Sequence, residues 1–150
     1  MTGAGEVDRF LEYLRVERNA SPATRTAYGR DLGRFIDYLE RRGRGDPAGA
    51  DTADVQGFVA AEHRRGVSGR SLARSLAAIR AFYAWLLREG RAYRDPAADV
   101  RAPRTRRRLP QALEVEEVER LVAVPGDDAL ARRDRALLEL FYSAGLRLAE

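Results

Sequence analysis

The sequence of this chain is dominated by apolar residues that recur every three or four positions, and it shows no clear strand pattern. This spacing places the apolar side chains on one stripe of a helix, and that stripe must be buried against another element. Segments 6–18, 22–42, 52–65 and 69–89 each carry such a stripe. Four helices within about 85 residues, joined by short loops, predict a compact helical bundle.

Capping residues predict where these helices begin and end. Ser21 and Ser68 stand at expected N-cap positions, where a serine hydroxyl accepts from the first free backbone N–H groups. Pro22 fits the first helical turn, and Gly43 and Gly90 are typical stops because glycine readily adopts the left-handed conformation. The core residues predicted on the fourth helix are Leu72, Leu76, Ile79, Phe82, Tyr83, Trp85 and Leu86.

A basic stretch separates the predicted bundle from the rest of the chain. Residues 101–110 hold five arginines, two prolines and no acid. This composition is typical of an extended linker between domains. We therefore divide the chain into a helical domain at 1–100, a linker at 101–112 and the start of a second domain at 113–150.

Two further helices are predicted at 114–122 and 129–144. The sequence ends just as a new element begins after them, so we expect this chain to be part of a longer protein. A domain cut in this way lacks packing partners for its apolar side chains. We therefore expect the second domain to be poorly ordered and to expose Leu137, Leu140 and Phe141.

Composition narrows the classes of protein. The net charge is +4, and all 27 basic residues are arginines. Either a GC-rich genome or a need for phosphate contacts explains this bias, since arginine binds phosphate well. The lack of cysteine and the single His63 argue against disulfides and metal sites. No apolar run is long enough to span a bilayer and no signal peptide is apparent, so we expect a cytoplasmic protein without a membrane partner.

Three segments, in order along the chain, resemble the tyrosine recombinases. Residues 21–35 read SPATRTAYGRDLGRF and residues 76–86 read LAAIRAFYAWL, and both are similar to helices of that family's DNA core-binding domain. Residues 133–150 read RDRALLELFYSAGLRLAE and resemble its first catalytic motif, although Ala149 stands where many Xer proteins have serine. The resemblance covers essentially the whole chain and is strongest to the Xer recombinases, to the XerC type rather than the XerD type.

The resemblance implies an all-α fold over these residues, with a four-helix SAM-like core-binding bundle followed by the first helices of a catalytic domain. Such enzymes cut and rejoin DNA through a 3′-phosphotyrosyl intermediate. The covalent link conserves the bond energy, so no cofactor, ATP or metal is expected. Xer enzymes act at a double-stranded DNA recombination site, with a second Xer-type recombinase in a heterotetramer, and resolve chromosome dimers at cell division.

The resemblance also assigns catalytic roles near the end of the sequence. Arg147 matches the family's first catalytic arginine, which donates hydrogen bonds to the charged oxygens of the phosphorane transition state. Glu150 matches an acid that supports the active site. The family's other catalytic residues, including its tyrosine, would lie beyond Glu150. We expect Tyr142 to be a core residue rather than the nucleophile, and the chain to bind DNA without cutting it.

The fourth helix offers a candidate DNA-binding face. At 100° per residue, Arg70, Arg74 and Arg88 fall on one side, opposite the apolar ridge, with small alanines between them. Arg80 lies nearer the edge of the ridge and has either a DNA-binding or a structural role. The remaining candidates, each of which could equally be an ordinary solvated side chain, are Arg25 and Thr26 on the second helix and Arg104, Arg106, Arg107 and Arg108 in the linker.

Three alternatives remain open at this point. An integrase of a phage or mobile element shares the chemistry but often carries an extra N-terminal domain. A truncated DNA-binding remnant would lack catalysis. A helical protein-interaction module, with arginines that reflect genome composition alone, would show no steep dependence of DNA binding on salt.

Overall fold

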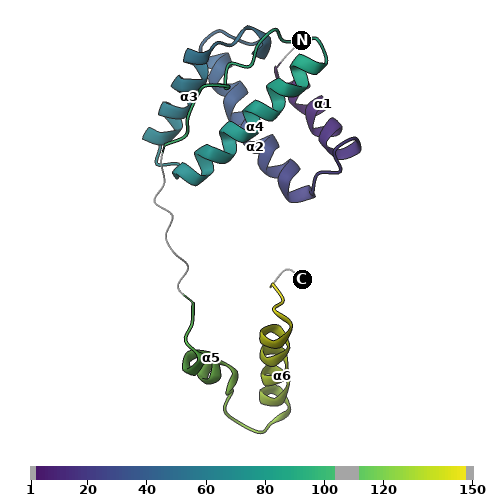
Figure 1. The fold of residues 1–150 in the computed structure, drawn as a ribbon, viewed down its shortest axis with the longest axis vertical. Coiled ribbons are helices and arrows are strands. Elements are labelled where there is room, and N and C mark those ends of the chain that lie inside the picture. Colours follow the sequence, from purple (N-terminus) through teal and green to yellow (C-terminus); the bar gives the residue numbers. More distant parts are fainter. Residues whose placement is uncertain (1–2, 104–111, 148–150) are drawn as a thin grey trace. The chain divides into compact units, whose positions relative to one another are not determined.

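The computed structural model describes residues 3–103 and 112–147, and every regular element within them is a helix (Figure 1). This confirms the all-α fold class. The chain divides into two compact units, Met1–Arg106 and Arg107–Glu150. The boundary between them falls within the stretch of sequence predicted as a linker. The exact limits of the domains stay a prediction. The helices are α1 Gly3–Val16, α2 Pro22–Arg41, the 3-10 helix η1 Pro47–Gly49, α3 Thr52–Arg64, α4 Gly69–Arg88, α5 Val115–Val122 and α6 Ala129–Ala144.

The predicted helix ends are confirmed by their capping geometry. The Ser21 hydroxyl accepts from the backbone N–H of Thr24 at 3.1 Å, and the Ser68 hydroxyl accepts from that of Ser71 at 3.3 Å. Each hydroxyl satisfies one of the N–H groups that the first helical turn leaves without an intrahelical acceptor. Just after the C-terminal end of α2, Gly43 has a φ of 73°. The left-handed backbone there ends α2 at little steric cost because glycine has no Cβ.

The first helix begins three residues earlier than the periodicity predicts. Gly3 is buried against Ile36, and a Cβ added at Gly3 would lie 2.8 Å from the Ile36 side chain. The lack of a side chain at Gly3 therefore allows α1 to extend along α2. The apolar spacing gave no sign of this close approach, because glycine adds nothing to a hydrophobic stripe.

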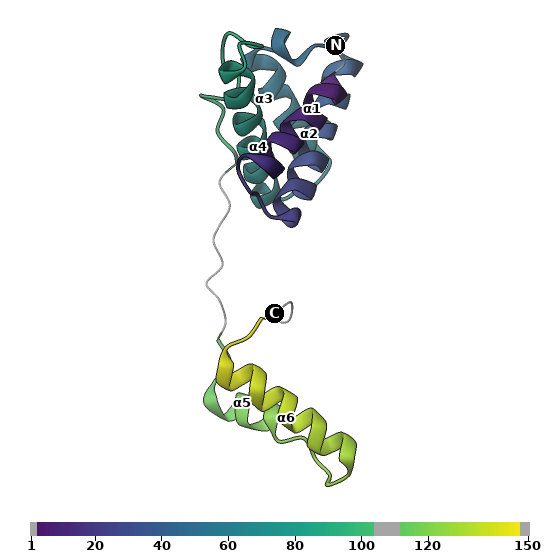
Figure 2. The same cartoon turned by 90° about the vertical axis from the view of Figure 1, so that its right-hand side faces the viewer.

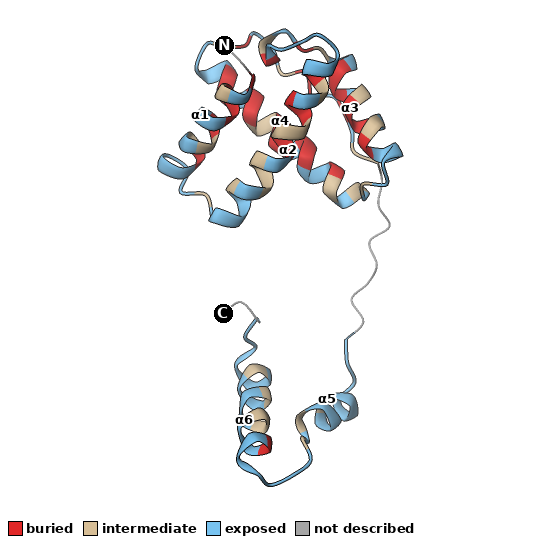
Figure 3. Cartoon of the chain, turned by 180° about the vertical axis from the view of Figure 1, so that it is seen from behind, coloured by how far each residue is buried: buried red, intermediate tan, exposed pale blue. Residues whose placement is uncertain are grey.

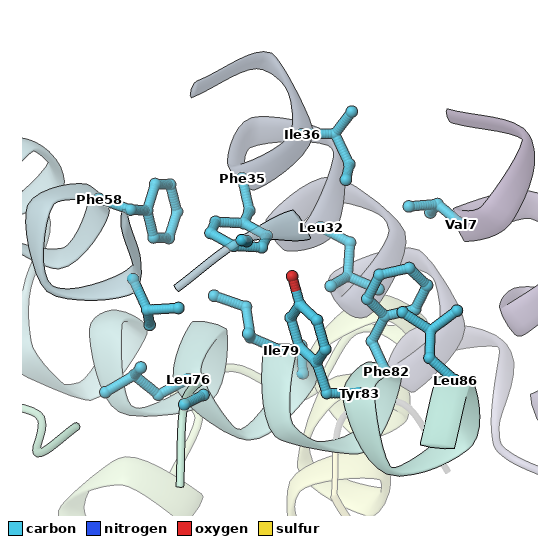
Figure 4. Packing of buried hydrophobic residues seen from close by; sticks show 14 of the residues in the cluster. Val7, Leu32, Phe35, Ile36, Phe58, Leu76, Ile79, Phe82, Tyr83 and Leu86 are labelled. Carbon is cyan, nitrogen blue, oxygen red and sulfur yellow. The ribbon is translucent and has the colours of Figure 1, made fainter. Parts of the chain in front are cut away.

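The core of the first unit lies where α1, α2, α3 and α4 pack together (Figures 1 and 2). Aromatic rings pack edge to face within it: the ring centroids of Phe35 and Phe58 are 5.3 Å apart, and those of Phe10 and Phe82 are 5.5 Å apart. Such pairs add to the stability gained by burying the rings. All the residues predicted for the core on α4 are buried, and several of them are seen in Figure 4.

Tyr83 connects this core to the loop between α2 and α3. Its ring and the Phe35 ring lie close together (Figure 4), with their centroids 6.4 Å apart. Its hydroxyl donates to the Pro47 carbonyl oxygen at 2.7 Å. Burial raises the pKa of the Tyr83 hydroxyl far above its usual value. The phenol therefore stays a neutral donor, and it satisfies a carbonyl in the η1 turn.

The second unit has very little buried surface of its own. Among its described residues only Ala131 is buried, whereas Leu137 is 46% exposed and Leu140 is 54% exposed (Figure 3). This confirms the expected exposure of those two leucines, and Phe141 is half-buried. The prediction of Tyr142 as a core residue is wrong for this chain, because its side chain is 64% exposed. Tyr142 lines an open groove between α5 and α6, and two helices alone do not enclose its ring.

Candidate nucleic-acid interface

One side of α4 combines positive charge with small side chains. We define the arginine–alanine face by Arg70, Ala73, Arg74, Ala77, Ala81, Ala84 and Arg88. All of these residues are exposed except Ala81, which is half-buried. They recur every three or four positions, so they lie along one side of the helix, opposite the buried ridge. The alanine methyl groups leave the surface low between the cations, which lets a phosphate backbone approach closely.

Arg74 of this face is held by a buried acid, Asp31. Its Nε donates to Asp31 Oδ2 at 2.8 Å, and its Nη2 donates to Asp31 Oδ1 at 3.3 Å. The Asp31 side chain has no exposed surface, whereas that of Arg74 is 43% exposed. The hydrogen bond to Asp31 raises the pKa of Arg74 above its usual value, so the guanidinium group is charged under all physiological conditions.

The ion pair between Arg74 and Asp31 belongs to a chain of charges that joins three helices. Arg34 Nη2 donates to Asp31 Oδ1 at 2.5 Å, and Arg34 Nε lies 3.6 Å from Glu62 Oε2. Glu62 in turn accepts from Arg65 Nη1 at 2.8 Å. Three cations and two buried carboxylates thus alternate across α4, α2 and α3, so each buried carboxylate lies between two guanidinium groups, although Glu62 Oε2 accepts no hydrogen bond from the described residues.

Arg88 lies at the other end of the arginine–alanine face, against an aromatic ring. Its guanidinium carbon is 4.2 Å from the centroid of the Tyr13 ring, and its Nη1 donates to the Tyr13 hydroxyl at 2.9 Å. Two carboxylates, those of Glu17 and Glu89, lie 3.5 Å and 3.2 Å from its Nη2. Arg88 is therefore held in place by a cation–π contact and by acids that neutralise part of its charge.

The other predicted DNA contacts on the helices have different surroundings. Arg70 is exposed at the start of α4, and no contact among the described residues engages its guanidinium group. Thr26 is exposed on α2. Arg25, next to it, is half-buried, and its Nε has no hydrogen-bond acceptor among the described residues. All three stay predictions as DNA contacts.

Arg80 has a structural position. Its Nε donates to the Ala97 carbonyl oxygen at 3.0 Å and its Nη2 donates to the Val100 carbonyl oxygen at 2.5 Å. The side chain is half-buried at the edge of the arginine–alanine face. Of the two roles that the sequence left open, this geometry favours the structural one, because the guanidinium group already satisfies two backbone acceptors.

An open groove of about 560 Å³ adjoins the arginine–alanine face. It lies between the end of α1, the start of α2 and the second half of α4, and Ala81, Ala84 and Arg88 line both the groove and the face. Trp85 forms part of its wall, although the ring belongs mainly to the core and is 7% exposed. The groove also carries Arg18 and Thr24, so its rim adds a further cation next to Arg88.

The predicted catalytic residues are only partly described. Arg147 is exposed just after Gly145, whose φ of 61° ends α6 in the left-handed conformation. Arg147 makes contacts of its own. Glu150 and the linker residues Arg104, Arg106, Arg107 and Arg108 lie outside the described residues. Their roles as catalytic support and DNA contacts remain predictions.

Sequence reasoning missed the role of Asp31. Asp31 lies in the segment that resembles the recombinases, and its position three residues before Arg34 on a helix is a signal for an ion pair. The second partner, Arg74, lies 43 positions along the chain. No local spacing rule brings the two together.

The described residues show neither a metal-binding cluster nor a membrane-spanning helix. No group of three or more histidine, cysteine or acidic residues among them is arranged to hold a metal ion. Within the same part of the chain, no helix combines the length and the apolar character that crossing a membrane requires.

Comparison with known proteins gives consistent matches. Residues 7–90 match the model of the phage integrase N-terminal SAM-like domain. Tyrosine recombinase XerC of Xanthomonas campestris pv. campestris (strain B100) is 53% identical over 144 residues, which cover 96% of this chain and 45% of that protein. The XerC proteins of Xylella fastidiosa (strain 9a5c) and Pseudomonas aeruginosa (strain LESB58) are 50% and 47% identical, over 96% and 97% of this chain and 49% and 48% of their own lengths.

The matched domain and the bundle coincide. The family model begins within α1 and ends just after α4, so it spans the four helices that enclose the core. The chain spans less than half the length of each of these three relatives. The chain belongs to the tyrosine recombinase (phage integrase) family, and its first unit is the N-terminal SAM-like domain of that family.

Proposed function

We propose that this chain is the DNA-binding N-terminal part of a XerC-type site-specific recombinase. The arginine–alanine face carries the proposal: three cations stand on one side of α4, separated only by small side chains. Arginine forks suit phosphate groups, and a flat, low surface between them fits the backbone of a duplex. The family assignment and the similarity to XerC proteins support the same function.

The proposed contacts are to phosphates rather than to bases. Arg70, Arg74 and Arg88 extend from one side of a single helix, and each can place a guanidinium group against a backbone oxygen. Such contacts fix the position of the protein on the duplex and carry no sequence information by themselves. They release condensed counterions, so the binding constant falls steeply as salt rises.

In the proposed reaction a tyrosine attacks a phosphodiester bond and forms a 3′-phosphotyrosyl link, and the freed 5′-hydroxyl leaves. The 5′-hydroxyl of a partner strand then attacks the link and releases the tyrosine. We assign Arg147 to the nonbridging oxygens of the transition state and Glu150 to its support. The 150 residues hold no counterpart of the family's later catalytic motifs, so we expect this chain to bind DNA without cleaving it.

The biological setting is proposed from the family resemblance. A XerC-type enzyme acts on a short double-stranded recombination site, in a heterotetramer with a second Xer-type recombinase, and resolves chromosome dimers at cell division. The similarity to XerC proteins over 96% or more of this chain favours this setting over a phage or mobile-element integrase.

Fluorescence anisotropy with a labelled 30-base-pair duplex tests the binding. The affinity is measured at several salt concentrations for the wild-type chain and for a triple variant, Arg70→Ala, Arg74→Ala and Arg88→Ala. Each lost phosphate contact should reduce the slope of log K against log salt by about 0.9, so a loss of about two to three is expected.

A matched control separates specific contacts from net charge. The triple variant Arg41→Ala, Arg64→Ala and Arg94→Ala removes the same charge from exposed positions outside α4. Its slope should stay within about one unit of the wild type. Equal losses in both variants would contradict the assignment of the interface, and no salt-dependent binding by the wild type would favour a protein-interaction module instead.

A further inference from the structure

Asp31 is an acid in the middle of a DNA-binding domain, and its setting is unusual for an acid. Its side chain has no exposed surface, yet its carboxylate reaches the arginine–alanine face through Arg74. Arg34 and Arg74 both donate to the same oxygen, Oδ1, at 2.5 Å and 3.3 Å. The buried carboxylate therefore fixes two guanidinium groups, from α2 and α4, next to each other.

We propose that Asp31 is a positioning residue, which holds the Arg74 guanidinium group in one orientation for contact with the DNA backbone. This inference rests on the proposed DNA binding and assigns to that interface a residue that does not itself touch the DNA. Arg74 makes the contact, and Asp31 acts through it.

The geometry of the hydrogen bonds leaves Arg74 able to bind a second anion. Asp31 occupies the Nε–H and one N–H of Nη2, which form one edge of the planar guanidinium group. Nη1 and the remaining N–H of Nη2 form the adjacent edge, and these can donate to two phosphate oxygens. An arginine that is held on one edge therefore presents its other edge in a fixed direction.

A side chain that is already held in one orientation loses less conformational entropy when it binds DNA. A free arginine side chain has many rotamers, and a contact that selects one of them loses that conformational entropy. Arg70, which has no partner among the described residues, bears this loss when it meets DNA. Arg74 has already undergone it during folding, because the bonds to Asp31 form with the bundle.

The positioning role and simple electrostatics predict opposite results. Removal of a negative charge close to DNA should strengthen binding, because the net positive charge of the protein increases. If Asp31 positions Arg74, then Asp31→Asn should weaken binding despite the gain in positive charge. The sign of the change in affinity therefore separates the two explanations.

The first experiment measures the affinity of the 150-residue chain for a 30-base-pair duplex by fluorescence anisotropy. Asp31→Asn should bind about fivefold more weakly and lose about 0.9 from the salt slope, as expected for one phosphate contact. The control is Asp37→Asn, on the same helix α2, because Asp37 is exposed and no contact among the described residues engages it. Asp37→Asn should bind equally well or more tightly.

A double-mutant cycle excludes a general loosening of the bundle. In an Arg74→Ala background, Asp31→Asn should no longer weaken binding, because the guanidinium group of Arg74 is absent, and the loss of a negative charge should leave the affinity equal or slightly higher. A structural defect would lower the affinity in both backgrounds. Circular dichroism and thermal unfolding of each variant report the fold separately from the binding.

A second pair of variants decides the question if Asp31→Asn does not fold. Arg74→Lys and Arg70→Lys both keep the positive charge on the same face, but a lysine cannot donate to both carboxylate oxygens of Asp31 as the guanidinium edge does. Arg74→Lys should lower the affinity severalfold more than Arg70→Lys does, because both substitutions lose a guanidinium fork but only the one at Arg74 also loses the bonds to Asp31. Equal effects of the two substitutions would overturn the proposal.

The failure of the positioning role differs from the failure of the proposed function. Wild-type affinity that does not fall with salt would overturn DNA binding itself, and the role of Asp31 with it. Salt-dependent binding by the wild type, together with Asp31→Asn that binds as tightly as Asp37→Asn, would overturn only the positioning role.

Discussion

The guanidinium group of Arg80 donates to the carbonyl oxygen of Val100 at 2.5 Å, and so ties the middle of α4 to the segment that follows the bundle. A second bond, to Ala97, strengthens the attachment. Arg80→Ala should leave two carbonyl groups without a donor and reduce the free energy of unfolding by about 1–3 kcal/mol. Hydrogen exchange should show faster exchange of the Ala97 and Val100 amides.

Arg94→Ala provides the control for Arg80→Ala, because Arg94 is an exposed arginine close to the same segment. It should leave the exchange rates of Ala97 and Val100 unchanged. If Arg80→Ala instead lowered DNA affinity as much as Arg74→Ala, with unchanged exchange, the structural role of Arg80 would be wrong.

The aromatic core of the first unit should be sensitive to truncation. Phe35 is fully buried and packs against the rings of Phe58 and Tyr83. Phe35→Ala should reduce the free energy of unfolding by about 3–5 kcal/mol, because it removes buried surface and leaves a cavity. Urea denaturation followed by circular dichroism measures this. Leu137→Ala, on the exposed side of α6, should change it by less than about 0.5 kcal/mol.

The N-cap of α4 should contribute measurably to stability. Ser68→Ala removes the hydroxyl that accepts from the Ser71 backbone N–H, so the first turn of α4 loses one acceptor. The expected cost is about 1 kcal/mol. Ser143→Ala is the matched control, because Ser143 is exposed near the end of α6 and caps no helix start. A similar loss of stability in both variants would argue against the capping role.

Acid should weaken the start of α3 through Asp51. The backbone N–H of Asp54 donates to Asp51 at 3.0 Å and lowers the pKa of that carboxyl below its ordinary value of 3.8, with help from Arg44. A lowered pKa means that the unfolded chain takes up the proton first. The stabilisation is therefore present above about pH 4 and is lost as the pH falls through the lower value of the folded state.

Asp51→Asn keeps an oxygen acceptor at this N-cap but cannot titrate. The difference in melting temperature between wild type and Asp51→Asn should therefore be largest near pH 6 and should shrink towards pH 2. Differential scanning calorimetry at a series of pH values measures it. A difference that stays constant over this range would show that the charge of Asp51 does not contribute.

The two units should differ in local stability. The first encloses an aromatic core, whereas the described part of the second buries only Ala131. Native-state hydrogen exchange should therefore find slow amides in α2 and α4 and fast exchange throughout 113–147. Uniform protection through residue 147 would contradict the expectation that the second unit is poorly ordered in this chain.

The sequence allowed the helices to be predicted because their signals are local. Ser21, Ser68 and Gly43 lie next to the helix ends that they define, and the α4 ridge follows from one period. The partners of Arg74 and Arg80 could not be predicted in this way. Their bonds span 43 and about 20 positions, and they depend on how the helices pack.

The difference between local signals and contacts made by packing also explains which parts of the candidate site could be predicted. The arginine–alanine face could be predicted, because a face is a property of one helix. Which of its cations is held, and by what, is a property of the bundle. Tyr142 was misplaced for a related reason: an apolar helix predicts a buried side, but burial requires a neighbour that covers it.

Trp85 is the only tryptophan of the chain, and it lies at the boundary between the core and the groove beside Arg88. Its indole ring stacks with Phe82 on one side, with the two ring centroids 6.1 Å apart. At an excitation wavelength that tyrosine does not absorb, the intrinsic emission therefore comes from this one indole ring, which contacts both the core and the groove. Unfolding of the bundle should shift that emission to longer wavelength, whereas a polyanion seated along α4 should alter its intensity without such a shift, so an unlabelled sample can report both events.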